Sequence, residues 1–374
     1  MNPLVSIIIN NYNYGRFLGD AIDSALQQTY PNTEIIVVDD GSTDHSINIL
    51  SSFGNKIYSL LKTNKGQASC FNTGFQVCKG DIILFLDADD YLQENVVEKA
   101  VQLFEDRKVA KVHWRLNRVN EEGNIIGKSL PDSNLAEGNL KPQLIQFGPS
   151  QCGGPPHSPP TSGNIWSRHF LEKILPMPEE VFRGGADGYL FALAPLYGEI
   201  RKINETLGFY RVHGSNNTVN PGYIFNYFTR FEECCNGLSK HLAQQGIDID
   251  PASWPRDHWY HKVNEAMNMV REKIDEGSKF ILIDDSHWVT EKNFFGRTRI
   301  PFMEQHGYYA GPPLSDSEAI HEIEKQKENG ANYIVVPWSC YWYLDQYTTF
   351  AGYLTQHYPV IAHNDLVKIY AIYE

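Results

Sequence analysis

The hydrophobic positions of the first ninety residues follow two alternating patterns. Short runs that are apolar at nearly every position predict buried strands, and stripes of apolar residues at helical spacing predict helices between them. Strands that alternate with helices in this way predict an α/β fold, with a mostly parallel, Rossmann-like sheet and helices on both of its faces. The expected strands are residues 4–10, 34–38, about 57–61 and 81–86, and the expected helices are residues 16–28, 44–53 and 66–78.

The pattern is less regular in the middle of the chain and becomes regular again near its end. A Pro-containing stretch at residues 248–257 is the expected boundary between the two regions. We therefore expect a large domain at residues 1–220, a helical linker at 221–256 and a small α/β domain of unknown role at 257–374. The later elements expected are a strand at 109–119, a loop at 148–163, helices at about 167–174, 184–197, 223–243, 258–275, 316–328 and 344–357, and strands at 279–283, 333–336, 359–362 and 367–372.

Composition and charge narrow the classes of function. The chain has 374 residues, 42% of them hydrophobic, and a formal net charge of −13, with no run of Lys or Arg. Nucleic acids and anionic membranes are therefore poor candidates for partners. No segment reaches the length of an apolar spanning helix, the start does not resemble a signal peptide, and the six cysteines include no CxxC pair. The expectation is a soluble, cytoplasmic protein.

Two acidic clusters follow predicted strands. Asp39-Asp40 comes directly after one strand, and Asp87-Ala88-Asp89-Asp90 after another. Ligands of open α/β sheets bind outside the carboxyl ends of the strands. Asp87 and Asp89 together could hold one Mg²⁺ or Mn²⁺ ion and one sugar hydroxyl, and Asp39-Asp40 could accept hydrogen bonds from a base or a ribose. Capping of the helices that follow is the alternative for both clusters.

Six short motifs follow one another along the chain, at residues 5–13, 36–44, 64–69, 72–74, 87–90 and 210–216. Together they resemble glycosyltransferase family 2, and the resemblance covers about the first 215 residues. It implies the GT-A fold for residues 1–220, a nucleotide diphosphate sugar as donor, commonly UDP-linked, inversion at the anomeric carbon, and a divalent metal, Mn or Mg. It also suggests a place in polysaccharide biosynthesis.

The resemblance also implies roles for individual residues. Tyr12 corresponds to a contact with the donor base, Asp39 to the acid at the base or ribose, and Asp87 to the acid at the ribose or donor sugar. Asp89 corresponds to the metal ligand, and His213 to the histidine that completes the metal shell. Asp187 corresponds to the acid that serves as the catalytic base. The full expected site is Asn11, Tyr12, Asp39, Asp40, Gln67, Asn72, Asp87 and Ala88 for the donor, Asp89 and His213 for the metal, Asp187 for catalysis, and Thr161, Ser162, Gly163 and Asn164 on the acceptor side.

Alternatives to several of these roles stay open. His213 could be an ordinary loop histidine, Asp187 a first-turn acid that satisfies helix N–H groups, and the 161–164 segment a helix cap. The sequence also departs from the family at two positions. Asn11 stands where many members have Pro, and Phe71 stands where many have an Arg that would face the donor phosphates or base.

Other classes of function compete with sugar transfer. A nucleotidyltransferase could use the same metal and nucleotide cradle, and a non-catalytic scaffold could bind nucleotide sugars without turnover. A dinucleotide-dependent oxidoreductase is disfavoured, because no GxGxxG motif follows the first strand. The acceptor, the donor sugar and any assembly into a homo-oligomer are not fixed by the sequence.

The C-terminal region carries two features of less certain meaning. Asp284-Asp285-Ser286-His287 ends a predicted strand, and we expect a turn there rather than a site. Five aromatic residues, Trp338, Tyr341, Trp342, Tyr343 and Tyr347, fall within ten positions. We expect them to pack at a domain or subunit interface, with Trp342 as a buried ring, rather than to stack on sugars.

Overall fold

The computed structural model of the chain consists of two compact units. Residues 1–216 and 229–255 form the first unit, and residues 217–228 and 256–374 form the second. The segment expected to be a linker, 221–256, is thus divided between the two units. The structure describes residues 2–104, 106, 108–149, 158–214, 216, 221–255, 259–284, 293–305 and 308–372, without the side chains of 221–228, 259, 260, 293 and 308, so Ser215, Asp285, Ser286 and His287 lie outside it.

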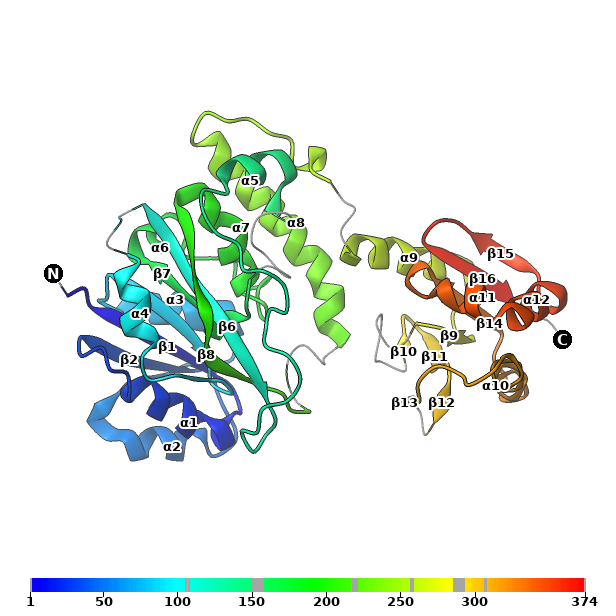
Figure 1. Cartoon of the computed structure of the whole chain (residues 1–374), viewed down its shortest axis with the longest axis horizontal. Helices are drawn as coiled ribbons and strands as arrows, with labels where there is room; N and C mark the ends of the chain where they lie inside the picture. The colour runs from blue at the N-terminus through cyan, green and yellow to red at the C-terminus, as the bar shows by residue number, and fades with distance from the viewer. Residues whose placement is uncertain are drawn as a thin grey trace. The chain divides into compact units, whose positions relative to one another are not determined.

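One eight-stranded sheet forms the centre of the first unit (Figure 1), in the order β3-β2-β1-β4-β7-β6-β8-β5. Strands β1, β2, β3 and β4 pair in parallel, as expected from the alternating pattern. The far half is mixed, because β7 is antiparallel to both β4 and β6, and β5 is antiparallel to β8. The strands are β1 Val5–Asn11, β2 Thr33–Asp39, β3 Tyr58–Leu61, β4 Ile82–Asp87, β5 Tyr91–Leu92, β6 Val109–Val119, β7 Asn164–Ser167 and β8 Glu199–Arg211.

Helices cover both faces of this sheet. On one face, alternate residues of β1 join a buried cluster with Leu18 and Ala21 of α1. On the other face Ile8 of β1 meets α3 so closely that a Cβ on Gly74 would lie 2.4 Å from it. The helices of the unit are α1 Gly15–Leu26, α2 Ser46–Phe53, α3 Gln67–Val77, α4 Val96–Gln102, α5 Lys141–Phe147, α6 Arg168–Ile174, α7 Asp187–Tyr197 and α8 Pro221–Ala243, of which α8 is shared with the second unit.

The second unit has its own six-stranded sheet, in the order β10-β11-β9-β14-β16-β15, and a separate β12-β13 pair. The helix expected at 344–357 is two helices, because the backbone leaves helical geometry at Tyr347. The elements are α9 Trp259–Lys273, β9 Lys279–Leu282, β10 Asn293–Phe294, β11 Arg297–Pro301, β12 Glu304–Gln305, β13 Tyr308–Tyr309, α10 Asp316–Glu328, β14 Tyr333–Pro337, α11 Trp342–Gln346, α12 Thr348–His357, β15 Val360–His363 and β16 Val367–Ala371.

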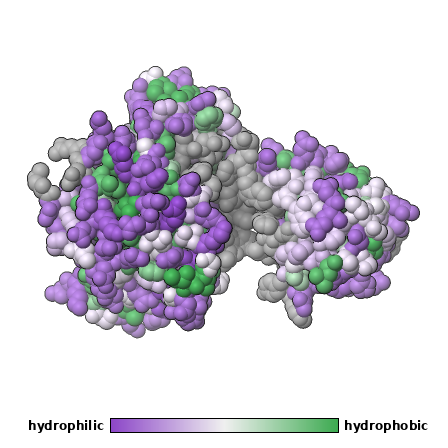
Figure 2. Space-filling model, viewed as in Figure 1, coloured by the Kyte–Doolittle hydropathy of each residue, from purple (hydrophilic) through white to green (hydrophobic). Residues whose placement is uncertain are grey.

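Within the described part of the chain, no helix is both long and apolar enough to cross a bilayer. Hydrophilic residues dominate the face of the first unit that Figure 2 shows, and hydrophobic residues are scattered among them.

The aromatic cluster of the second unit divides into buried and exposed members. Tyr343 and Tyr347 are buried in its core, whereas Trp342 is 37% exposed and lies against Tyr343 at a ring separation of 4.1 Å. The expectation of a buried Trp342 ring was therefore wrong. Its place at the start of the short helix α11 leaves one side of the indole toward solvent.

This exposure lowers the stability loss that we expect for Trp342→Ala. Removing a partly exposed indole should cost about 1–2 kcal/mol, less than the roughly 3–5 kcal/mol of a fully buried ring. Tyr343→Ala, at the neighbouring buried position, is the matched comparison and should cost more. Urea unfolding of both variants measures the difference. A Trp342→Ala loss equal to that of Tyr343→Ala would contradict this expectation.

Candidate active site

The predicted acidic clusters meet at one edge of the first sheet. β1 lies between β2 and β4, and the pairing register sets Asn11 beside Asp39 and Asn10 beside Asp87. Because all three strands are parallel, their carboxyl ends reach the same edge. The sequence therefore placed Asp39 and Asp87 correctly with respect to each other.

The end of β2 is a tightly bonded turn. Asp39 is buried and accepts hydrogen bonds from the Asn11 amide (2.7 Å) and from the backbone N–H of Ser42 (2.9 Å). Tyr12, the next residue along from Asn11, is 46% exposed. Asp39 is therefore held rigidly, and Tyr12 is accessible to a ligand, as a nucleoside-binding role requires. That role itself stays a prediction.

Asp40 organises the loop that leads into α3. Its carboxylate pairs with the Lys62 ammonium and accepts the backbone N–H groups of Lys65 (3.0 Å) and Gly66 (2.6 Å). These bonds give Asp40 a structural task that the sequence did not indicate. Its predicted contact with the sugar donor would have to be made in addition to them.

Gln67 connects three parts of the site. Its amide nitrogen donates to Asp87 (2.9 Å) and to the Thr161 hydroxyl (3.3 Å), and its amide oxygen accepts the backbone N–H of Ala186 (3.0 Å). One side chain thus links the end of β4, the predicted acceptor segment and the residue before Asp187. This link was not apparent in the sequence, where Gln67 was assigned only to donor binding.

Asn72 and Ala88 occupy more structural positions. The Asn72 amide exchanges two hydrogen bonds with the Met177 backbone, each 3.0 Å, and Ala88 is fully buried next to the acidic cluster. Phe71, at the position where the family often has Arg, is also buried and stacks on Phe85 at 4.0 Å. Donor-binding roles for Asn72 and Ala88 stay predictions.

Asp87 sits among other negative charges. Burial, followed by the neighbouring Asp89 carboxylate, raises the pKa of Asp87 to about 7, while hydrogen bonds from Asn10 and Gln67 oppose the rise. Burial likewise raises the pKa of Asp90 well above its ordinary range, with Asp89 as the next cause. A site with this concentration of carboxylates favours a cationic ligand.

Asp89 and His213, 124 residues apart in the sequence, face each other directly. The His213 Nε2 lies 3.0 Å from the Asp89 carboxylate, and the Asn216 amide lies 3.3 Å from the same oxygen. Two neighbouring ligands of an octahedral ion at about 2.1 Å from the metal are about 3.0 Å apart, so this oxygen and nitrogen fit one Mg²⁺ or Mn²⁺ ion. Among the described residues, no group of three or more His, Cys, Asp and Glu forms a metal site by itself.

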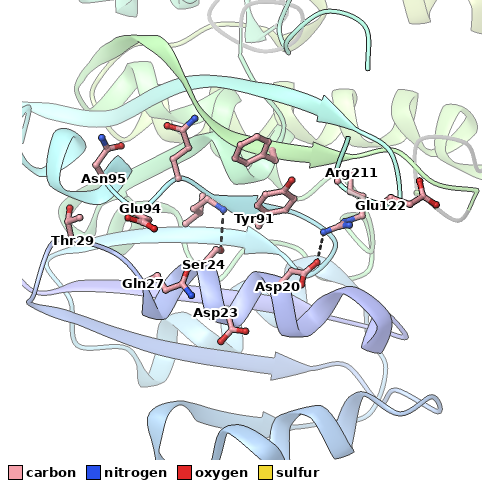
Figure 3. Close-up of a pocket in the computed structure, with 14 residues that line it drawn as sticks. Asp20, Asp23, Ser24, Gln27, Thr29, Tyr91, Glu94, Asn95, Glu122 and Arg211 are labelled. Carbon is pink, nitrogen blue, oxygen red and sulfur yellow. Dashed lines mark hydrogen bonds and ion pairs between the residues drawn. The ribbon is translucent and has the colours of Figure 1, made fainter. Parts of the chain in front are cut away.

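Arg211 and Asp90 hold the segment that carries Asp89 in place. The Arg211 guanidinium donates to the Asp89 carbonyl oxygen (3.0 Å) and pairs with Asp20 (2.7 Å), and its backbone N–H donates to Asp90 (3.0 Å). Sequence analysis missed both roles, although Asp90 belongs to the acidic run and Arg211 lies two residues before His213. Residues of α1, β5 and β8 line a groove of about 860 Å³. Figure 3 shows Arg211 and Asp20 paired in this groove.

The predicted acceptor segment forms a turn rather than a helix start. Residues Thr161–Gly163 make one 3₁₀ turn and β7 follows at once, so the alternative of a helix cap is wrong here. The Ser162 hydroxyl donates to Asp90 (2.6 Å), and the Asn164 amide donates to the Pro160 carbonyl (2.8 Å). Thr161 reaches the site through Gln67, whereas Asn164 is buried behind the turn.

Asp187 begins α7, and its carboxylate accepts the backbone N–H of Gly188 (2.9 Å). Burial raises the pKa of Asp187, although this bond, Arg230 and Thr161 lower it. The Asp187 charge is also close enough to raise the pKa of Asp87. A carboxylate with a raised pKa, near the donor-side acids, is suited to proton abstraction near neutral pH.

The entry to α3 depends on a glycine. Gly66 has φ = 90° and ψ = 179°, a conformation that is largely restricted to glycine, and a Cβ there would lie 2.5 Å from the Arg183 backbone. We expect Gly66→Ala to destabilise the protein by about 2–3 kcal/mol, because both the conformation and the contact become strained. Urea unfolding measures the loss. Gly19→Ala, in open space on α1, is the control and should be neutral or stabilising, and an equal loss in both variants would refute the expectation.

Comparison with known proteins agrees with the geometry. Residues 6–156 match the family described as glycosyl transferase family 2. An uncharacterized glycosyltransferase of Nostoc sp. is 35% identical over 217 residues, which are 57% of this chain and 66% of that protein. The chain spans between 24% and 66% of the length of the curated relatives compared with it.

Two solved structures are remotely similar to this chain. The S. aureus TarS 1-349 complex with UDP-GlcNAc is 18% identical, with a TM-score of 0.49 and 72% of each chain covered. The mannosyltransferase PcManGT of Pyrobaculum calidifontis, in complex with GDP-Man and Mn²⁺, is 16% identical, with a TM-score of 0.43 and coverage of 73% of this chain and 76% of the other.

The mixed α/β sheet with acids at the ends of β2 and β4 and the family match together define the first unit as a glycosyltransferase domain of the GT-A type. Its family is glycosyltransferase family 2.

Proposed function

We propose that the chain transfers a sugar from a nucleoside diphosphate sugar, UDP-linked, to an acceptor hydroxyl, with inversion and with the help of a divalent metal ion. The observation that carries the proposal is the convergence of Asp39, Asp87 and the Asp89–His213 pair at one sheet edge, with Asp187 close by.

The residues divide into a donor side and an acceptor side. In this proposal Tyr12 and Asp39 bind the nucleoside, and Asp87 binds a hydroxyl of the ribose or the sugar. Asp89 and His213 would hold the metal ion, which supplies positive charge next to the diphosphate as it departs. The described cluster itself is acidic, so the metal would balance carboxylate charge as well.

Asp187 acts on the other side of the reacting carbon. Inversion requires that the acceptor oxygen attack opposite the leaving group, and a base must take its proton. The bond from the acceptor oxygen to the anomeric carbon forms, the bond from that carbon to the diphosphate breaks, and the proton goes to the Asp187 carboxylate. Gln67 bonds both Asp87 and the residue before Asp187, so it holds the donor side and the acceptor side of the site at a fixed separation.

One assay separates this proposal from its competitors. The protein is incubated with UDP- and GDP-sugars, one at a time, with Mn²⁺ and a mixture of candidate acceptor hydroxyl compounds, and the products are analysed by chromatography. Release of nucleoside diphosphate, even by slow transfer to water, supports sugar transfer. In a parallel incubation with a sugar phosphate and a nucleoside triphosphate, release of pyrophosphate indicates a nucleotidyltransferase. Binding without any product indicates a scaffold.

A further inference from the structure

A lysine is buried in the first unit, next to the candidate active site. Lys111 lies on β6 and is only 2% exposed. Its ammonium donates a hydrogen bond to the Ser158 hydroxyl (2.9 Å) and lies 4.3 Å from the centre of the Phe191 ring and 5.3 Å from that of Trp166. Burial of an ammonium is unfavourable unless hydrogen bonds and a nearby opposite charge compensate for the lost water. One hydroxyl and two aromatic rings compensate only in part.

Two of the three contacts of the ammonium, with Ser158 and with Phe191, lead toward Asp187. Phe191 follows Asp187 by four residues in α7, so the two side chains share one face of that helix. Ser158 precedes Thr161 by three residues, and Thr161 is one of the groups that lower the pKa of Asp187. Lys111 therefore contacts the two segments that carry and position Asp187.

In the part of the chain that the structure describes, charged groups of β4, β6 and α8 act on Asp187. Arg230 of α8 and Lys111 are the positive charges that lower the pKa of Asp187, and Asp87 is a negative charge that interacts with it from β4. In return, Asp187 is the charge that favours the protonated form of Lys111, whose pKa burial lowers. His113, two residues along β6, feels the positive charge of Lys111 and bonds the Ala136 carbonyl at 2.8 Å.

We propose that Lys111 is a positioning residue for Asp187: its ammonium ties α7 to the 158–161 segment and keeps the Asp187 carboxylate charged and in place. The contacts with Ser158 and Phe191 place the ammonium beside the two segments next to Asp187, and the consequence for turnover rests on the proposed role of Asp187 as the base. Lys111 is not one of the residues assigned to the site by resemblance.

The interaction can be tested without a substrate. The melting temperature of the full chain is measured for the wild type, Lys111→Met, Asp187→Asn and the double variant at pH 7.5. If the two charges interact, Lys111→Met is less favourable beside a carboxylate than beside an amide. We expect the change in melting temperature on Lys111→Met to be more negative in the wild type than in the Asp187→Asn background by at least about 2 °C. Equal changes in both backgrounds overturn the proposal.

A pH profile tests the consequence for catalysis. The base must be unprotonated, and loss of a nearby positive charge raises the pKa of a carboxylate, so the acid limb of the profile moves to higher pH. With the nucleotide sugar that gives most nucleoside diphosphate in the assay above, we expect Lys111→Met to shift this limb upward by about one unit. Lys108→Met removes an exposed lysine near the same strand and should leave the limb in place.

The outcomes are distinguishable. If the wild type releases no nucleoside diphosphate from any sugar, the proposed function fails, while the melting experiment still decides whether Lys111 and Asp187 interact. If the limb of Lys111→Met does not move although the protein is active, the positioning role is refuted. If Lys111→Met does not fold, Ser158→Ala takes its place, because it removes the hydroxyl that the ammonium binds, and an unshifted limb in that variant also refutes the role.

Discussion

Asp187→Asn should lower turnover by roughly 10²-fold or more while leaving the affinity for the nucleotide-sugar donor nearly unchanged. The amide oxygen of Asn can still accept the Gly188 N–H at the start of α7, so the helix keeps its first turn. An amide, however, cannot take up the proton of the acceptor hydroxyl. The loss should therefore appear in kcat rather than in donor binding.

The measurement combines nucleoside diphosphate release with calorimetric titration of the donor. Asp23→Asn, an exposed acid on α1, makes the same chemical change away from the acidic edge and should keep wild-type turnover. Near wild-type turnover in Asp187→Asn would show that Asp187 only caps α7. A loss of donor affinity as large as the loss of turnover would mean that the substitution disturbs the site more widely.

Asp89→Ala should remove most of the metal-dependent binding of UDP. Substitution of residues that only orient metal ligands lowers the affinity for the metal by about 10- to 100-fold. Loss of the proposed ligand Asp89 should therefore lower the metal-dependent affinity for UDP by about 100-fold or more. The truncation also leaves His213 without the carboxylate that it faces at 3.0 Å. Binding is measured by titration of UDP in the presence of Mn²⁺ and, separately, in the presence of a chelator.

Two comparisons decide this prediction. The wild type should bind UDP much more tightly in Mn²⁺ than in chelator, and Asp89→Ala should bind it weakly in both. Asp23→Ala changes the net charge by the same amount on an exposed face and should behave as the wild type. Equal affinity of the wild type in Mn²⁺ and in chelator would rule out a metal in donor binding.

The parallel half of the sheet was readable from the sequence because its strands are continuously apolar. β1, β2 and β4 are buried along most of their length, and the acids stand immediately after the apolar runs of β2 and β4. In contrast, β8 was missed altogether. Of its thirteen residues, four are buried: Ile200, Leu207, Gly208 and Arg211. Charged residues interrupt the alternation of hydrophobic and polar positions that would predict a strand.

The links between parts of the site were the least predictable features. The bonds of Gln67 join residues 20, 94 and 119 positions away, and those of Lys111 depend on Ser158 and Phe191. Sequence patterns report which face of an element is buried, but not which distant side chain meets it. A lysine inside the apolar run of β6 therefore looked like part of an ordinary strand.

Asp89 and His213 face each other but are far apart in the sequence, and this separation affects the order in which the site folds. Asp39, Asp87 and Asp89 are made early in synthesis, and their strands pair through crossovers within the first ninety residues, whereas Asp187, Arg211 and His213 emerge about a hundred residues later. Closing such a long loop costs entropy before the Asp89–His213 contact compensates for it, so this contact should form late in folding. A fragment that ends at residue 156 would contain the whole family match but neither Asp187 nor His213. With the roles proposed for these two residues, the nascent chain would be unable to transfer sugar until β8 had joined the sheet.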